Sequence, residues 1–184
     1  MYKKLLVVVD DRVVTQSAIW QGIELARLHR ADIFFFYVLP KYVFSNSDLL
    51  LEGESSPEEF ERKAREHASR MLAAASALAE GADVFSHAAV GIGADDAQCV
   101  AEAAIHRHCD LIVVGTEGRN AVMRLLTGSI VSGLISIADV PVLVCRDAGA
   151  ARGFGRRASV AIRAKSRRDE KRLRRERRAE EEND

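Results

Sequence analysis

The run IFFFYVL at residues 33–39 restricts the possible folds of this chain more than any other stretch. It is an unbroken set of apolar, β-prone residues that ends at Pro40. The run is too short for a typical helix, and it lacks the alternation of a strand with one face in water. Strands covered on both faces are typical of parallel sheets packed between helices. We therefore predict an α/β fold.

Short apolar runs and helical patterns alternate along the rest of the chain. The predicted strands are residues 4–9, 33–39, 84–90, 110–114 and 140–145. Helical spacing of apolar residues begins near Thr15, at Ser56, after Asp96 and at Gly128. This order predicts a three-layer fold in which a five-stranded, mainly parallel sheet has helices on both faces.

The second predicted helix has a clear start. Ser56 is suited to the N-cap, Pro57 to the first helical position and Glu59 to the third, where it would close a capping box. We expect this helix to stop at Gly81 and the polar residues 41–55 before it to form a long surface loop.

Composition excludes several classes of protein. The chain is 48% apolar and 29% charged, as in globular proteins, and no apolar run approaches the ~20 residues that span a bilayer. Acidic residues stand where a signal peptide would be cleaved. The three cysteines are far apart in sequence, which favours a reducing cytoplasm over a disulfide framework. His106 and His108 are two apart on a predicted helix, so they do not face each other as metal ligands would.

The charges are distributed unevenly. Residues 147–184 hold 13 Lys/Arg against 8 Asp/Glu, and the remainder holds 14 against 19. We expect a domain over residues 1–146 and a basic, charge-rich tail over 147–184 that is either helical or disordered.

Glycines follow the fourth predicted strand in the stretch GTEGRNAVMRLLTGS, residues 115–129. Gly115 permits close approach of a ligand to the strand end, and Gly118 permits a positive φ in a tight turn. Gly128 and Ser129 open the next helix, where free N–H groups favour an anion. In parallel sheets, ligands bind beyond the carboxyl ends of the strands at a topological switch point. The stretch is therefore suited to a phosphate site, or else it forms an ordinary strand exit and helix boundary.

Neither standard nucleotide motif is present. The P-loop needs a lysine before its serine or threonine, but Gly128 precedes Ser129. The dinucleotide fingerprint needs G-x-G-x-x-G after the first strand, where Asp10, Asp11 and Arg12 stand instead.

The glycine spacing resembles the G-2x-G-9x-G-[S/T] motif of the ATP-binding branch of the universal stress protein family. The resemblance extends over residues 1 to 146, because residues 6–10, 110–115 and 141–144 look like that family's first, fourth and fifth strands. It implies an adenine nucleotide alpha hydrolase-like fold that binds ATP, AMP or ADP, with Mg²⁺ or Mn²⁺, and a homodimer joined through residues 140–145. The nucleotide-binding residues that it implies are Asp10, Val38, Val114, Gly115, Gly118, Gly128, Ser129 and Ile130.

The loop after the first strand departs from the family pattern. Family members often have small residues there, whereas this chain has Asp11 and Arg12. Arg12 could pair with a phosphate or crowd the site, and Asp11 would repel a phosphate unless a cation intervened.

The resemblance implies a cytoplasmic stress-response regulator or sensor that hydrolyses ATP slowly or not at all. Asp10 and Glu117 are the only acids that we would place near phosphates or their metal, and we name no catalytic residue. One alternative is a protein that binds nucleic acid or an anionic membrane through the tail over residues 149–184. Another is a flavin domain of similar topology, with Tyr42 and Phe44 against the flavin.

Overall fold

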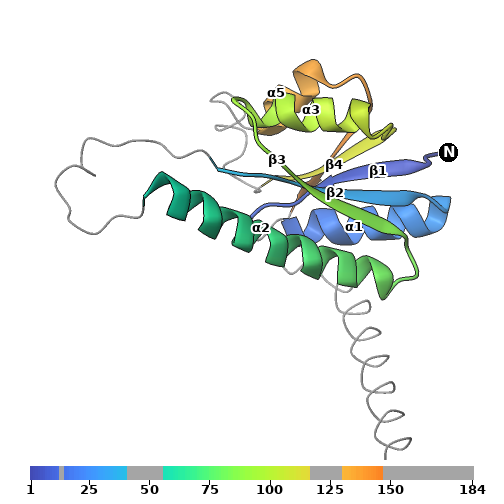
Figure 1. Ribbon diagram of the computed structural model, residues 1–184. Helices are drawn as coiled ribbons and strands as arrows, with labels where there is room; N and C mark the ends of the chain where they lie inside the picture. Colours follow the sequence, from blue (N-terminus) through green and yellow to red (C-terminus); the bar gives the residue numbers. More distant parts are fainter. Residues whose placement is uncertain (13–14, 41–55, 117–129, 147–184) are drawn as a thin grey trace, which may run out of the picture. The chain divides into compact units, whose positions relative to one another are not determined.

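A computed structural model describes residues 1–12, 15–40, 56–116 and 130–146, which all lie in the unit Met1–Asp147. Strands and helices alternate along it, as the sequence predicts (Figure 1). The strands are β1 (Lys4–Val8), β2 (Asp32–Val38), β3 (Ser86–Gly91), β4 (Leu111–Thr116) and β5 (Val142–Arg146). The helices are α1 (Thr15–His29), α2 (Pro57–Glu80), α3 (Asp96–His106) and α5 (Ile130–Ile137). None of these helices is long and apolar enough to cross a membrane.

The five strands form one sheet in the order β3-β2-β1-β4-β5, and every neighbouring pair is parallel. The predicted α/β fold with a parallel sheet is therefore confirmed. The chain moves outward from β1 through β2 to β3, and then returns to the other side of β1 to form β4 and β5. This reversal places the topological switch point between the carboxyl ends of β1 and β4.

Helices cover both faces of the sheet, α1 and α2 on one and α3 and α5 on the other (Figure 1). Successive β1 side chains therefore enter different halves of the core. Leu5 and Val7 join the cluster under α1 and α2, and Leu6 and Val8 join the one under α3 and α5. In β2, Phe35 is fully buried on the α1 and α2 side. Burial on both faces explains why the β2 run is apolar without alternation.

Two glycines let helices pack at short range. A Cβ added at Gly22 of α1 would lie 2.6 Å from a methyl carbon of Val7. One added at Gly133 of α5 would lie 2.5 Å from the Cβ of Ala97 on α3. Each glycine therefore fixes how closely its helix approaches a neighbouring element.

Helix α2 begins and ends where the sequence predicts. Ser56 is the N-cap, and its hydroxyl accepts a hydrogen bond from the backbone N–H of Glu59 at 3.2 Å. The Glu59 carboxylate lies 2.8 Å from Lys63 Nζ, so it forms an ion pair along the helix where we expected the return bond of a capping box. Gly81 is the C-cap and has right-handed helical dihedral angles. The positive φ after this helix belongs to Asp83 instead.

Candidate functional site

The predicted site residues that the structure describes lie at the carboxyl end of the sheet. Asp10 follows β1, Val38 ends β2, Val114 and Gly115 belong to β4, and Ile130 is the first residue of α5. Because the strands are parallel, the carboxyl ends of β1, β2 and β4 lie side by side there. Three of the predicted residues, together with Glu117, lie outside the described residues: Gly118, Gly128 and Ser129.

The aliphatic members of this set share one face of the sheet. Val38, Val114 and Ile130 all belong to or pack against the core cluster under α3 and α5. Val114 is fully buried, whereas Val38 and Ile130 are half-buried at its margin. Partly exposed aliphatic side chains beside a strand end are suited to contact the flat face of a ring.

Asp10 is held by a compact network just after β1. Its Oδ1 accepts a hydrogen bond from the backbone N–H of Arg12 at 2.9 Å, which forms an Asx turn, and another from the Thr15 hydroxyl. Its Oδ2 accepts one from Arg12 Nε at 2.7 Å and forms an ion pair with the same guanidinium. Thr15 is 2% exposed, so its hydroxyl is a fixed donor at the start of α1.

The Arg12 guanidinium therefore folds back over Asp10. Their side chains are 34% and 27% exposed, so the pair lies at the protein surface but is partly shielded from water. A ligand group that donates to Asp10 must replace donors that already occupy both carboxylate oxygens. In this arrangement Arg12 pairs with Asp10, the residue expected to contact the nucleotide.

Asp11 belongs to a second polar cluster, with Tyr37 of β2 and His67 of α2. The Tyr37 hydroxyl lies 3.2 Å and 3.3 Å from the two carboxylate oxygens, and His67 Nε2 lies 2.5 Å from Oδ1. The Tyr37 and His67 rings also meet edge to face, with their centroids 6.4 Å apart. Burial, followed by the negative charge of Asp11, raises the pKa of Tyr37 to about 12.

This second cluster turns Asp11 away from the aliphatic residues of the site. Tyr37 packs in the core cluster under α1 and α2, and His67 lies on α2. Val38, Val114 and Ile130 are on the opposite face of the sheet. Asp11 is therefore engaged with Tyr37 and His67 on the α1 and α2 face of the sheet.

Sequence reasoning missed Thr15, Tyr37 and His67. We interpreted Tyr37 only as part of an apolar run, although it alone in that run carries a hydroxyl group. Thr15 at a helix start was a recognisable signal, because threonine there often bonds a nearby polar group. His67 had no local signal, since its partner Asp11 is 56 positions away.

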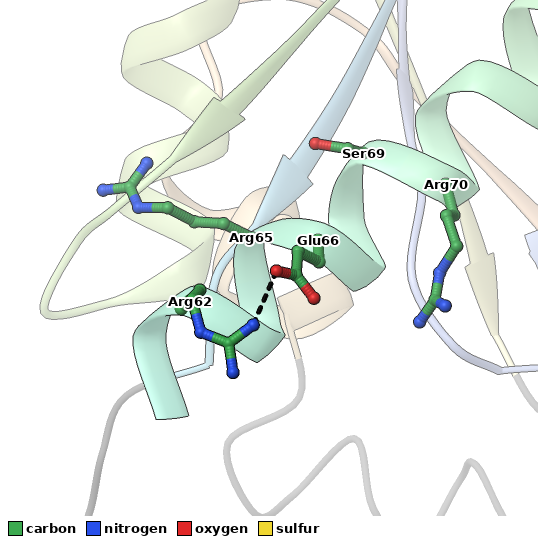
Figure 2. Close-up of a pocket in the computed structure, with 5 residues that line it drawn as sticks. All are labelled: Arg62, Arg65, Glu66, Ser69 and Arg70. Atoms are coloured by element: carbon green, nitrogen blue, oxygen red, sulfur yellow. Dashed lines mark hydrogen bonds and ion pairs between the residues drawn. The ribbon is translucent and has the colours of Figure 1, made fainter. Parts of the chain in front are cut away.

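A wide hollow lies elsewhere, on the outer surface of α2. It has a volume of about 530 Å³ and is lined by Arg62, Arg65, Glu66, Ser69 and Arg70. Figure 2 shows Arg62 bound to Glu66, with Arg65 and Arg70 extending in different directions. Arg65 is itself paired with Glu61, at 2.7 Å. The guanidinium groups do not converge, so this surface is a solvated, ion-paired helix face.

Other expectations concern parts of the chain that the structure does not describe. Tyr42, Phe44 and the tail over 149–184 all lie there. Within the described ranges, no group of three or more His, Cys, Asp and Glu side chains is placed to hold a metal ion.

Comparison with known proteins identifies the family. The sequence model described as "Universal stress protein family" matches residues 1–146. Universal stress protein MJ0531 from Methanocaldococcus jannaschii is 28% identical over 148 residues, which are 79% of this chain and 83% of that protein.

Solved structures share the fold. UspA from Lactobacillus plantarum has a TM-score of 0.64 at 23% identity, over 79% of this chain and 98% of that one. A universal stress protein family protein from Arabidopsis thaliana, solved with AMP bound, has a TM-score of 0.58 at 17% identity, over 80% of this chain and 93% of that one. Since the family model covers most of the sequence, this chain belongs to the universal stress protein family.

Proposed function

We propose that this protein binds ATP or a related adenine nucleotide, as in the ATP-binding branch of its family, at the carboxyl ends of β1, β2 and β4. The observation that carries the proposal is the gathering of Asp10, Val38, Gly115 and Ile130 at the switch point of the sheet. Solved structures in this family hold AMP, cAMP or dAMP, which supports an adenine nucleotide as the ligand class.

Two kinds of surface would contact different parts of the nucleotide. Val38 would line the adenine, and Gly115 would leave room for the ribose beside the strand end. Ile130 would stand at the helix start that binds the phosphates. Gly118, Gly128 and Ser129 would supply the phosphate contacts, together with the Mg²⁺ or Mn²⁺ that accompanies the nucleotide. The protein would act as a stress-response regulator or sensor with slow or no hydrolysis.

Calorimetric titration with ATP and Mg²⁺ tests the site. We expect saturable heat from the natural protein and none from Gly128→Val, because a branched side chain would block the helix start. Arg70→Gln is the control, since it removes an exposed charge on α2. Equal heat from Gly128→Val and the natural protein would exclude this location.

Substitution of Arg12 tests whether the nucleotide donates a hydrogen bond to Asp10. If the nucleotide donates to Asp10, it must displace the Arg12 pair, which is worth about 1 kcal/mol at a partly exposed position. Arg12→Gln should therefore tighten ATP binding about fivefold. Arg27→Gln is the matched control, because it removes an arginine from an Arg–Glu pair on α1. Weaker binding by Arg12→Gln would instead indicate a contact between Arg12 and the nucleotide.

We also propose a homodimer joined through residues 140–145. β5 is an edge strand, and Val142 and Val144 on it are only half-buried. Ile135 of the adjacent α5 is 62% exposed, which adds apolar surface at the same edge. Sedimentation equilibrium should give twice the chain mass, and Val144→Lys should shift it to the monomer mass.

A further inference from the structure

A small cavity lies at the opposite end of the strands from the proposed nucleotide site. It has a volume of about 180 Å³ and is lined by Lys4, Phe34, His87, Ala88 and Arg107. Lys4 is the first residue of β1, whereas Asp10 follows the other end of that strand. Phe34 and His87 are register partners in β2 and β3, and Arg107 caps the end of α3.

Positive charge converges on this cavity. Lys4 and Arg107 both line it, and His87 adds an imidazole. The Arg107 guanidinium carbon lies 5.1 Å from the centre of the Phe34 ring, and Phe34 is 4% exposed. Stacking on a buried ring restricts the guanidinium, so its N–H donors are partly preorganised.

These cations have no carboxylate partner among the residues that the structure describes. Asp110 lies next to Lys4 but forms no ion pair with the Lys4 or Arg107 side chain. Its carboxylate oxygens accept hydrogen bonds from the backbone N–H groups of Lys3 at 2.7 Å and Lys4 at 3.2 Å. Two like charges beside one cavity repel each other, and a bound anion would relieve that repulsion.

The end of α3 offers a competing explanation for Arg107, because cations stabilise the carboxyl ends of helices. However, the last carbonyl groups there already accept backbone hydrogen bonds. Arg107 N–H donates to Ala103 at 3.0 Å, and Cys109 N–H donates to Ala104 at 2.8 Å. The helix end alone also gives no reason for Lys4, from another element, to line the same cavity.

We propose that this cavity binds a small phosphate-class oxyanion, held by Lys4, Arg107 and His87 above the Phe34 ring. Its volume of about 180 Å³ is below the ~300–1,000 Å³ of typical small-molecule pockets, so it suits a phosphate group rather than a whole nucleotide. The site is therefore separate in place and in ligand size from the proposed nucleotide site.

The test is a titration of the full-length protein with inorganic phosphate, followed by NMR of the backbone amides and arginine side chains at constant ionic strength. We expect saturable shifts at Lys4, Ala88 and Arg107. Lys4→Gln and Arg107→Gln should each weaken binding at least about tenfold, because each removes charge-assisted hydrogen bonds. Arg107→Lys keeps the charge but loses the planar fork, so its loss should be smaller.

Two controls separate this site from other sources of phosphate binding. Arg70→Gln removes an exposed charge on α2, which contributes no residue to the cavity, so it should leave the affinity for phosphate unchanged. Gly128→Val should also leave it unchanged, because that residue belongs to the proposed nucleotide site.

The proposal is overturned if phosphate shifts no cavity residue, or if Lys4→Gln and Arg107→Gln both bind as well as the natural protein. It is also overturned if Arg107→Gln lowers the melting temperature while the natural protein shows no saturable binding. In that case Arg107 only stabilises the carboxyl end of α3. A parallel titration with glycerol 3-phosphate identifies the source, since tighter binding than inorganic phosphate would indicate a compact monoester.

Discussion

Replacement of Gly133 by alanine should destabilise this protein, although alanine is the better helix former. The new Cβ would lie 2.5 Å from the Cβ of Ala97, whereas carbon atoms in contact are about 3.5–4.0 Å apart. Neither Cβ can rotate away, because the backbone fixes its position. Helices α3 and α5 must therefore separate by about 1 Å or more.

The expected magnitude follows from two opposing terms. Overpacking of this kind costs about 1–3 kcal/mol, while replacement of glycine by alanine within a helix gains about 0.8–1.0 kcal/mol. The free energy of unfolding should therefore fall by about 1 kcal/mol in Gly133→Ala. Ala97→Gly should also destabilise, since it removes a buried methyl group from α3. When both changes are combined the clash disappears, so the double variant should be more stable than additivity predicts, by about 1–3 kcal/mol.

Urea unfolding of the natural protein and the three variants measures all four corners of this cycle. The m-values should agree, so that differences in midpoint report stability alone. A Gly133→Ala protein as stable as the natural one would refute the reasoning about the clash. A double variant whose loss equals the sum of the two single losses would show that Gly133 and Ala97 do not restrict each other.

Four further predictions follow from burial and charge. Asp11→Asn should lower the pKa of Tyr37 from about 12, as followed by ultraviolet titration, because it removes the second-largest cause of the rise. Tyr37 titrates near 10.0 when unfolded, so its protonated hydroxyl should contribute fully to the free energy of unfolding below pH 10. That contribution should be lost as pH rises toward 12. Tyr37→Phe should abolish this loss. Burial raises the pKa of Cys109 and Cys145 to about 11, so thiol reagents at neutral pH should label them slowly until urea unfolds the protein. Phe35→Ala should reduce the free energy of unfolding by about 3–5 kcal/mol, measured in the same urea assay, because Phe35 is fully buried.

The order of elements was predictable from sequence because strand burial and helix periodicity are local signals. The exact strand boundaries were not, because long-range hydrogen bonds set them. Residues 84–90 were predicted as a strand, but β3 begins at Ser86, since the Val84 N–H still donates to Ala79 of α2. The last strand was predicted to begin at residue 140, but β5 begins at Val142, after Pro141, which has no N–H to donate to a neighbouring strand.

The candidate site was predictable to a similar degree. The positions of Asp10, Val38 and Gly115 at strand ends followed from the order of elements. The orientation of Asp11 and Arg12 did not, because it depends on partners supplied by other elements. Asp11 contacts a tyrosine in β2 and a histidine in α2, and no pattern within the loop could have indicated either of them.

The central place of β1 in the sheet has a consequence for synthesis of the chain. β1 pairs with β2 on one side and β4 on the other, and Leu6 lies opposite Ile112. The α1, β2, α2 and β3 segments are therefore complete before β4 leaves the ribosome. Until then β1 is an edge strand, apolar on both faces and open to pairing with any extended chain nearby. A chain halted before β4 should be more prone to aggregation than one that extends through β5.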